Sequence, residues 1–96
     1  MIDASQLHRA AIIIDATCPL ARSRPYIDWW REGGVTAIAP TITGMTGNAR
    51  SGLQLIGGWH RYARERNDTI IVREAADIER AKAAGKIGLI LHCQGT

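Results

Sequence analysis

Apolar residues of this chain occur in two alternating patterns. Short, mainly apolar segments occupy residues 11–15, 35–40, 69–72 and 86–96. Between them lie stretches at 22–34, about 50–66 and 74–85 in which apolar residues recur every three or four positions. The first pattern is typical of strands buried on both faces of a parallel sheet, and the second is typical of amphipathic helices. The chain is therefore predicted to alternate strictly as β-α-β-α-β-α-β.

Helix signals support the three predicted helices. Ser23 is a plausible N-cap, Pro25 suits a first turn, and Gly33 and Gly85 follow the last periodic residues of two helices. Gly57 lowers the helix propensity of the middle segment, unless it permits close packing against the sheet. The side chains expected to face inward are Tyr26, Trp29, Trp30, Leu53, Leu55, Ile56, Trp59, Tyr62, Ala63, Ile78 and Ala81.

The order of elements predicts one α/β domain over residues 1–96. Right-handed crossovers between parallel strands should place consecutive strands side by side, with the helices packed outside. Four such strands form either a small open sheet or half of an eight-stranded barrel.

Composition narrows the class of protein. The chain is 46% hydrophobic and 22% charged, with a formal net charge of +3, and no apolar run approaches the roughly 20 residues that cross a bilayer. The densest basic run, 60–68, is interleaved with Glu65 and Asp68, which favours a solvated helix over a nucleic-acid interface. Neither a membrane nor a nucleic-acid partner is expected, and the predicted location is cytoplasmic. Cys18 and Cys93 lack metal-knuckle spacing and are expected to be reduced thiols.

Polar residues follow the first and last predicted strands. The carboxyl ends of parallel strands open on one edge of a sheet, where barrels and doubly wound folds bind ligands. Side-chain alternation places Asp15 and Thr17 on one face of the first strand, and His92 and Gln94 on one face of the last. These four residues are predicted to form a polar pocket for a metal ion, a water or a substrate group. The alternative is that they only satisfy loop amides at turns.

Three stretches together resemble a known family. The runs "IIIDATCPL", "WWREGGVTAIAPT" and "ADIERAKAAGKIGLILHCQG", in this order, resemble the N-terminal part of the membrane (renal) dipeptidases, a metal-dependent branch of the amidohydrolase-like barrels. The resemblance covers nearly the whole chain but only about the first third of a typical member. It implies that the chain is the N-terminal half of a TIM-type (β/α)8 barrel. It also implies hydrolysis of a dipeptide by metal-activated water at a two-zinc site.

The family's metal-ligand positions are changed in this chain. The first strand of the family carries Asp-Gly-His-x-Asp, and here Thr17 stands in place of the histidine and Pro19 in place of the second aspartate. A later bridging glutamate is replaced by Gln94. Proline has no side-chain donor and a neutral amide cannot bridge two cations, so the usual two-zinc site is not expected. The resemblance leaves one divalent ion, such as zinc, in the complete protein, with Asp15 and Gln94 as candidate ligands.

Three hypotheses follow. The chain is the N-terminal part of a dipeptidase-like metallohydrolase, inactive and metal-free as a 96-residue fragment, whose complete barrel takes a dipeptide or related amide. Alternatively, it belongs to a barrel that lost its metal site and binds a small molecule without catalysis. The third possibility is an open-sheet regulatory or interaction domain. A half barrel would expose the edge of its fourth strand and its inner face, so self-association or pairing with the remainder of the barrel is expected.

Overall fold

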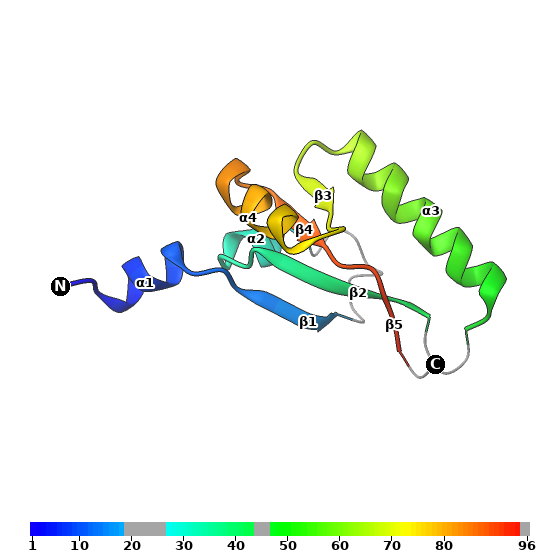
Figure 1. Cartoon of the computed structure of the whole chain (residues 1–96), viewed down its shortest axis with the longest axis horizontal. Helices are drawn as coiled ribbons and strands as arrows, with labels where there is room; N and C mark the ends of the chain where they lie inside the picture. Colours follow the sequence, from blue (N-terminus) through cyan, green and yellow to red (C-terminus); the bar gives the residue numbers. More distant parts are fainter. Residues whose placement is uncertain (19–26, 44–46, 95–96) are drawn as a thin grey trace.

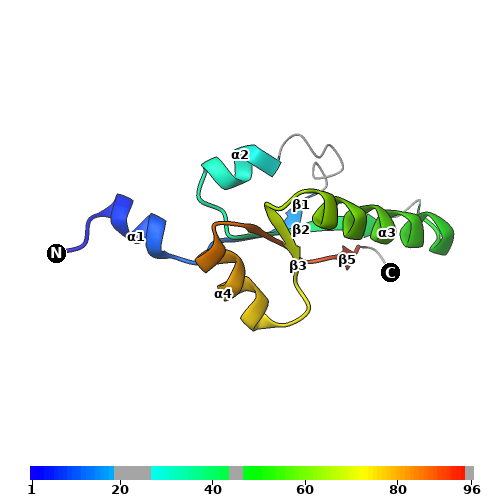
Figure 2. The same ribbon diagram turned by 90° about the horizontal axis from the view of Figure 1, so that it is seen from above.

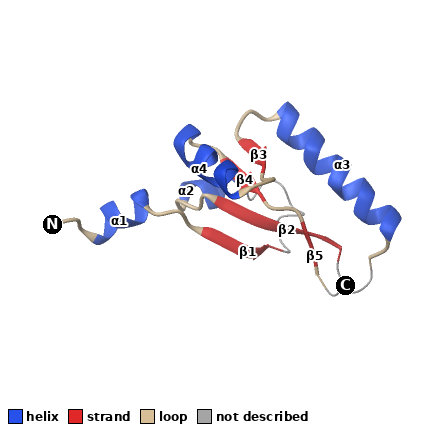
Figure 3. Ribbon diagram, viewed as in Figure 1, coloured by secondary structure: helices blue, strands red, loops and turns tan. Residues whose placement is uncertain are grey.

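The computed structural model describes residues 1–18, 27–43 and 47–94, which form an α/β sheet structure (Figures 1 and 3). In chain order the elements are α1 (Ala4–Ala10), β1 (Ile14–Cys18), α2 (Ile27–Glu32), β2 (Ala37–Thr43), α3 (Ala49–Glu65), β3 (Thr69–Ile71), α4 (Ala75–Ala84), β4 (Ile87–Leu89) and β5 (His92–Cys93). The predicted alternation of strands and helices is confirmed. The predictions made for Ser23, Pro25 and Tyr26 fall outside the described residues.

Helix α1 was not predicted, because its short segment has no apolar stripe. It stands away from the sheet at the N-terminal end of the molecule (Figure 1), and none of its residues is buried. Asp3 and Gln6 form a capping box at its start. Its tie to the rest of the chain is a hydrogen bond of 2.7 Å from His8 Nε2 to the carbonyl of Gly33.

The strands pair in parallel in the order β1-β2-β4-β3, with β5 pairing β2 beyond β4. The predicted consecutive order is therefore wrong, since β4 lies between β2 and β3. Burial explains the difference: β2 and β4 are almost entirely buried, as central strands must be, whereas β3 is three residues long and only partly buried. The edges of the four-strand path are β1 and β3. The predicted exposed edge at the fourth strand is wrong for β4, which is paired on both sides, whereas β5 pairs β2 alone among the described strands.

The strand order puts helices on both faces of the sheet. The chain moves across the sheet in one direction from β1 through β2 to β3, but in the opposite direction from β3 back to β4. Right-handed crossovers then require α2 and α3 on one face and α4 on the other. Figure 2 shows α2 and α4 on opposite sides of the sheet. Helices therefore cover both faces of the sheet, as strands that are apolar on both faces require.

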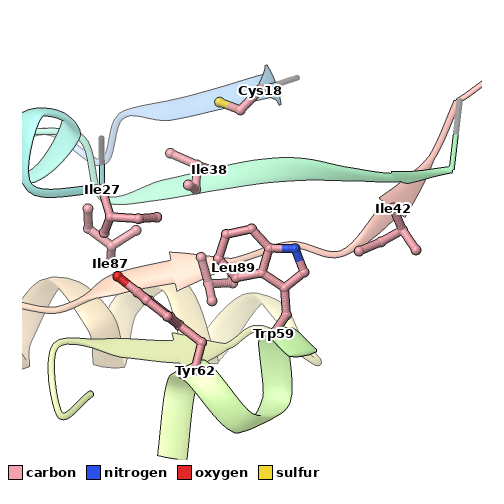
Figure 4. Packing of buried hydrophobic residues seen from close by; sticks show 8 residues of the cluster. All are labelled: Cys18, Ile27, Ile38, Ile42, Trp59, Tyr62, Ile87 and Leu89. Carbon is pink, nitrogen blue, oxygen red and sulfur yellow. The ribbon is translucent and has the colours of Figure 1, made fainter. Parts of the chain in front are cut away.

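The main core lies between the sheet and the helices α2 and α3 (Figure 4). Trp59 and Tyr62 of α3 pack edge to face, with ring centroids 5.6 Å apart, as the helical pattern predicted. Ile27 anchors α2, whereas Trp29 is 67% exposed, and Leu53 of α3 is 69% exposed, so these two inward predictions are wrong. The buried members of this core are Cys18, Ile27, Ile38, Ile42, Trp59, Tyr62, Ile87 and Leu89.

The opposite face is packed tightly around Gly88 of β4. A Cβ atom at this position would lie 2.7 Å from Val72 Cγ2, 3.3 Å from Ala37 Cβ and 3.8 Å from Ala81 Cβ. The glycine therefore allows α4 and the end of β3 to approach the two central strands. Gly57 of α3 has nothing within 4 Å of the same atom, so it does not serve close packing.

Helix ends and ion pairs hold the outer elements. Asp77 accepts hydrogen bonds from the backbone N–H groups of Arg73 (2.7 Å) and Glu74 (3.1 Å) at the start of α4, and Gly85 ends that helix with a φ of 67°. These backbone hydrogen bonds, together with the Arg80 side chain, lower the pKa of Asp77 to about 2.

None of the described helices is both long enough and apolar enough to span a bilayer.

A second electrostatic cluster joins α2 to the turn before β3. Arg31 forms ion pairs with Asp28 and Asp68, and Arg66 donates to Asp68 at 2.6 Å. Burial opposes ionisation of Asp68, but the hydrogen bond and charge of Arg66 and the charge of Arg31 outweigh it and lower the pKa of that carboxyl. The cluster fixes the position of α2 relative to the end of α3.

Replacement of Gly88 by alanine is expected to destabilise the protein by about 1–3 kcal/mol, because the added methyl group overpacks the contact with Val72 and Ala37. Gly57→Ala is the matched control and is expected to stabilise by up to about 1 kcal/mol, since its Cβ enters open space in a helix. Urea unfolding of both variants measures the two changes. Equal effects of the two substitutions would contradict the close packing at Gly88.

Acid should weaken the start of α4 through Asp77. A carboxyl whose pKa falls from 3.8 to about 2 on folding stabilises the folded state above pH 4, and this stabilisation is lost as the pH falls toward 2. Asp77→Asn is therefore expected to be less stable than the parent at pH 7 and similar to it near pH 2. Urea unfolding at pH 7, 4 and 2 tests this, with the exposed Glu79→Gln as control. A stability gap for Asp77→Asn that is constant across this range would refute the assignment.

Candidate functional site

The carboxyl-terminal ends of β1, β2 and β5 form the edge where the sequence predicted a polar pocket. Two of these strands extend beyond their predicted ends. Strand β1 continues to Cys18, so Asp15 lies within the strand and does not follow it. Strand β2 passes through Pro40 and ends at Thr43. A proline has no backbone N–H to donate, so it fits a strand only where the ladder does not need one. On one side Pro40 is paired with Cys18, where the ladder between β1 and β2 is irregular. On the other side it lies between the residues of β2 that pair with β4 and those that pair with β5.

Asp15 lies on the face of the sheet that α2 covers. It is the cross-strand partner of Ile38, which belongs to the core beneath α2 and α3. The indole Nε1 of Trp30 donates a hydrogen bond of 3.1 Å to Asp15 Oδ2. The carboxylate thus connects β1 to the helix that follows it.

His92 lies on the other face of the sheet and is held by Thr41. The two residues are paired in the ladder between β2 and β5, and His92 Nε2 lies 3.2 Å from Thr41 Oγ1. Thr41 alternates with Ile38 and Ile42, so it points away from the core that α2 and α3 cover. The threonine is only 5% exposed, while the imidazole is half-buried and reaches the edge.

Thr43 adds a second hydroxyl to the same face of β2. It follows Thr41 by two residues, and its Oγ1 is buried without a hydrogen-bond partner among the described residues. Sequence reasoning missed both threonines because Pro40 was taken as the end of the strand. The alternation of Ile38 and Ile42 with Thr41 and Thr43 was the signal that could have identified them.

Thr17 and Gln94 are exposed at this edge. The backbone N–H of Gln94 donates to the carbonyl of Thr43 at 2.9 Å, which places the amide side chain next to the end of β2. No hydrogen bond joins any two of the four predicted pocket residues in the described part of the chain. The structure instead joins His92 to Thr41, with Gln94 directly after the strand that carries His92, and places Asp15 on the opposite face of the sheet.

The residues at this edge do not fit the two-zinc site of the family that the sequence resembles. Thr17 and Gln94 offer neutral oxygens where histidine and glutamate stand in that family, and Pro19 lies outside the described residues. No group of three or more His, Cys, Asp or Glu side chains suited to a metal ion occurs in the described ranges. The carboxylate of Asp15 is also engaged by Trp30 on the opposite face. We therefore assign no metal-binding role to Asp15 or Gln94.

Both cysteines are free, as predicted. Cys18 is 2% exposed, and its Sγ lies 3.7 Å from the backbone carbonyl of Asp15. Burial, with the neighbouring Asp15, raises the pKa of the Cys18 thiol to about 12. The thiol at the end of β1 is therefore a packing residue and not a nucleophile.

No protein-family model matches the chain, and no curated protein matches it. Among solved structures, the chain is similar to an amidohydrolase from Pseudomonas aeruginosa, with 29% sequence identity and a TM-score of 0.81 over 97% of its length. The chain spans 29% of the length of that amidohydrolase. The chain therefore has an amidohydrolase-like fold, and its parallel α/β sheet is consistent with part of a TIM-type barrel in which β4, and not β3, pairs with β2.

The two thiols are expected to differ sharply in reactivity. At pH 8 a disulfide reagent such as DTNB should modify the exposed Cys93 rapidly and leave Cys18 unmodified until the protein is unfolded, because only thiolates react. Counting released chromophore before and after adding guanidinium chloride measures this. In Cys93→Ser the rapid phase should disappear, and its persistence would contradict the buried position of Cys18.

Proposed function

We propose that the complete protein is a dipeptidase-like hydrolase that cleaves a peptide or amide bond in a small substrate. In this proposal the 96 residues supply one wall of the active site. The observation that carries the proposal is the likeness to the Pseudomonas aeruginosa amidohydrolase over 97% of the chain, at 29% identity. The resemblance of the sequence to the membrane dipeptidases narrows the substrate to a dipeptide or related amide.

His92 is the residue of this wall best suited to act on a substrate. It lies at the carboxyl-terminal edge of the parallel strands, where barrels carry their active sites. An imidazole exchanges protons near neutral pH, as general acid–base catalysis requires. The Thr41 hydroxyl can donate to Nε2 or accept from it, so the pair at 3.2 Å persists in either tautomer and holds the ring in place.

Gln94 complements this pair as a recognition group. Its amide offers both donors and an acceptor, which match the N–H and C=O of a peptide bond. Its backbone is fixed by the hydrogen bond to Thr43, so the side chain projects from an anchored position. We infer that Gln94 orients the substrate amide while His92 moves the proton.

Water activation by a divalent ion is the chemistry of the family that the sequence resembles. Because the donors of this chain do not fit that ion, a metal in the complete protein would require ligands from other strands. The side chains of this wall that would act on the substrate are then the Thr41 hydroxyl, the His92 imidazole and the Gln94 amide.

The remainder of the barrel is the proposed partner of the exposed side of β1. This strand is an edge of the sheet, and Ile12 and Ile14 are 47% and 46% exposed beside its free edge. An uncovered strand with apolar side chains pairs readily with another strand. Strands from the same barrel, or from a second copy, would cover it.

A second candidate function is binding of a small molecule without catalysis. The neutral side chains of Thr17 and Gln94 at the positions of two metal ligands favour it. A barrel mouth lined by threonines, an imidazole and an amide retains groups that fix the orientation of a polar ligand.

The proposed function is tested by assaying the full-length protein against a panel of dipeptides, with product detected by chromatography and metal content measured by elemental analysis. His92→Ala is expected to lower kcat/KM at least tenfold, because it removes the proton-transfer group, which contributes about 10²–10⁴-fold in other enzymes. Thr41→Val should lower kcat/KM by a smaller factor than His92→Ala, since it releases the imidazole from the hydroxyl that holds it in place.

His8→Ala is the matched control, because His8 contacts Gly33 at the other end of the sheet and should leave kcat/KM unchanged. Circular dichroism verifies that each variant is folded. An inactive full-length protein that binds small amides in calorimetry would replace the hydrolase with the binding barrel. Equal losses in His92→Ala and His8→Ala would remove His92 from the site.

A further inference from the structure

A second cavity lies along the outer edge of β3, away from the edge that carries His92. It has a volume of about 490 Å³ and lies between the second half of α3, the strand β3 and the start of α4. Figure 1 shows these three elements grouped on the side of the sheet opposite β1. The volume lies within the range of roughly 300–1,000 Å³ that small-molecule sites occupy.

Three cationic side chains line this cavity. Arg64 comes from α3, Arg73 from the loop before α4, and Lys86 from the residue before β4. None of them forms an ion pair with a carboxylate of the described residues, and Lys86 Nζ donates to the neutral amide oxygen of Asn67 at 3.1 Å. Arginines elsewhere behave differently, since Arg31, Arg66 and Arg80 each pair with acidic groups.

The acidic group of the lining does not neutralise these cations. Asp77 directs Oδ2 to the backbone N–H groups of Arg73 and Glu74, and Oδ1 to the side chain of Arg80. Arg80 pairs with Asp77 from outside the lining and also with Glu74. The lining itself holds three cations, Arg64, Arg73 and Lys86, against the one carboxylate of Asp77, which gives it a net positive charge.

A buried hydroxyl in the lining also lacks a partner. Thr69 opens β3 and is 3% exposed, and its Oγ1 has no hydrogen-bond partner among the described residues. Leaving such a group unsatisfied is costly, so native proteins pair it with a neighbour, a water or a ligand. The oxygen is closed to solvent in this structure, so only rotation of the Thr69 side chain toward the cavity would let its hydroxyl donate to an anion there.

We propose that this cavity binds the phosphate group of a small anionic molecule. Two arginines and a lysine in one lining are the kind of donors that phosphate favours, because the guanidinium fork matches two phosphate oxygens and the ammonium acts as a point charge. The site lies on the outside of the sheet and is independent of the proposed hydrolytic edge. Inorganic phosphate and a phosphate ester present the same chemistry to it.

The test is calorimetric titration of the full-length protein with inorganic phosphate, pyrophosphate and citrate at low ionic strength. Phosphate or pyrophosphate should bind saturably with one site per chain. Arg64→Gln and Arg73→Gln are each expected to weaken binding about tenfold or more, as loss of a charged hydrogen bond does. Arg61→Gln is the matched control, because it removes the same charge from an exposed position of α3 outside the cavity lining.

The results distinguish specific binding from general attraction to a basic surface. Weaker binding in Arg64→Gln and Arg73→Gln with unchanged binding in Arg61→Gln supports the site, provided that thermal unfolding of the variants matches the parent. Absence of saturable binding, or an equal loss in Arg61→Gln, overturns it. Citrate binding as tightly as pyrophosphate would overturn the assignment to phosphate. Peptidase activity does not enter this test, so its outcome is separate from that of the proposed hydrolase.

Discussion

The close contact between β2 and β4 at Gly88 is the constraint on which the arrangement of this chain depends. The missing side chain lets Ala37, Ala81 and Val72 meet over the centre of the sheet. On the other face, Ile38, Ile87 and Leu89 pack against α2 and α3. With both faces of β2 and β4 covered, these strands occupy the centre, and the short β3 is displaced to an edge.

This strand order separates two regions with different chemistry. The ends of β2 and β5 carry Thr41 and His92 at the edge where barrel enzymes act on their substrates. The free edge of β3 instead faces a cavity lined by unpaired cations. The two regions have no lining residue in common. The consecutive strand order expected from the sequence would have buried β3 and removed the second region.

The likeness to an amidohydrolase concerns the packing of the chain, whereas the changed ligand positions concern its metal chemistry. The barrel architecture depends on buried apolar strands, and these are retained at 29% identity over nearly the whole chain. Metal binding depends on a few side chains, and Thr17 and Gln94 do not supply them. His92 and Thr41 give the same edge a different set of polar groups. Fold and site can therefore diverge, because packing tolerates substitutions that coordination chemistry does not.

The sequence by itself determined the alternation of strands and helices, because unbroken apolar runs and helical periodicity are local properties of the chain. It also indicated Trp59, Tyr62 and Ala81 as inward-facing residues, and Gly85 as the end of a helix. It could not determine strand order, which depends on packing between segments far apart in the chain. Only the tertiary structure placed Asp15 beside Trp30 and His92 beside Thr41, because the face on which a residue lies follows from register and irregular pairing near Pro40. The partners of the predicted pocket residues were decided by the fold.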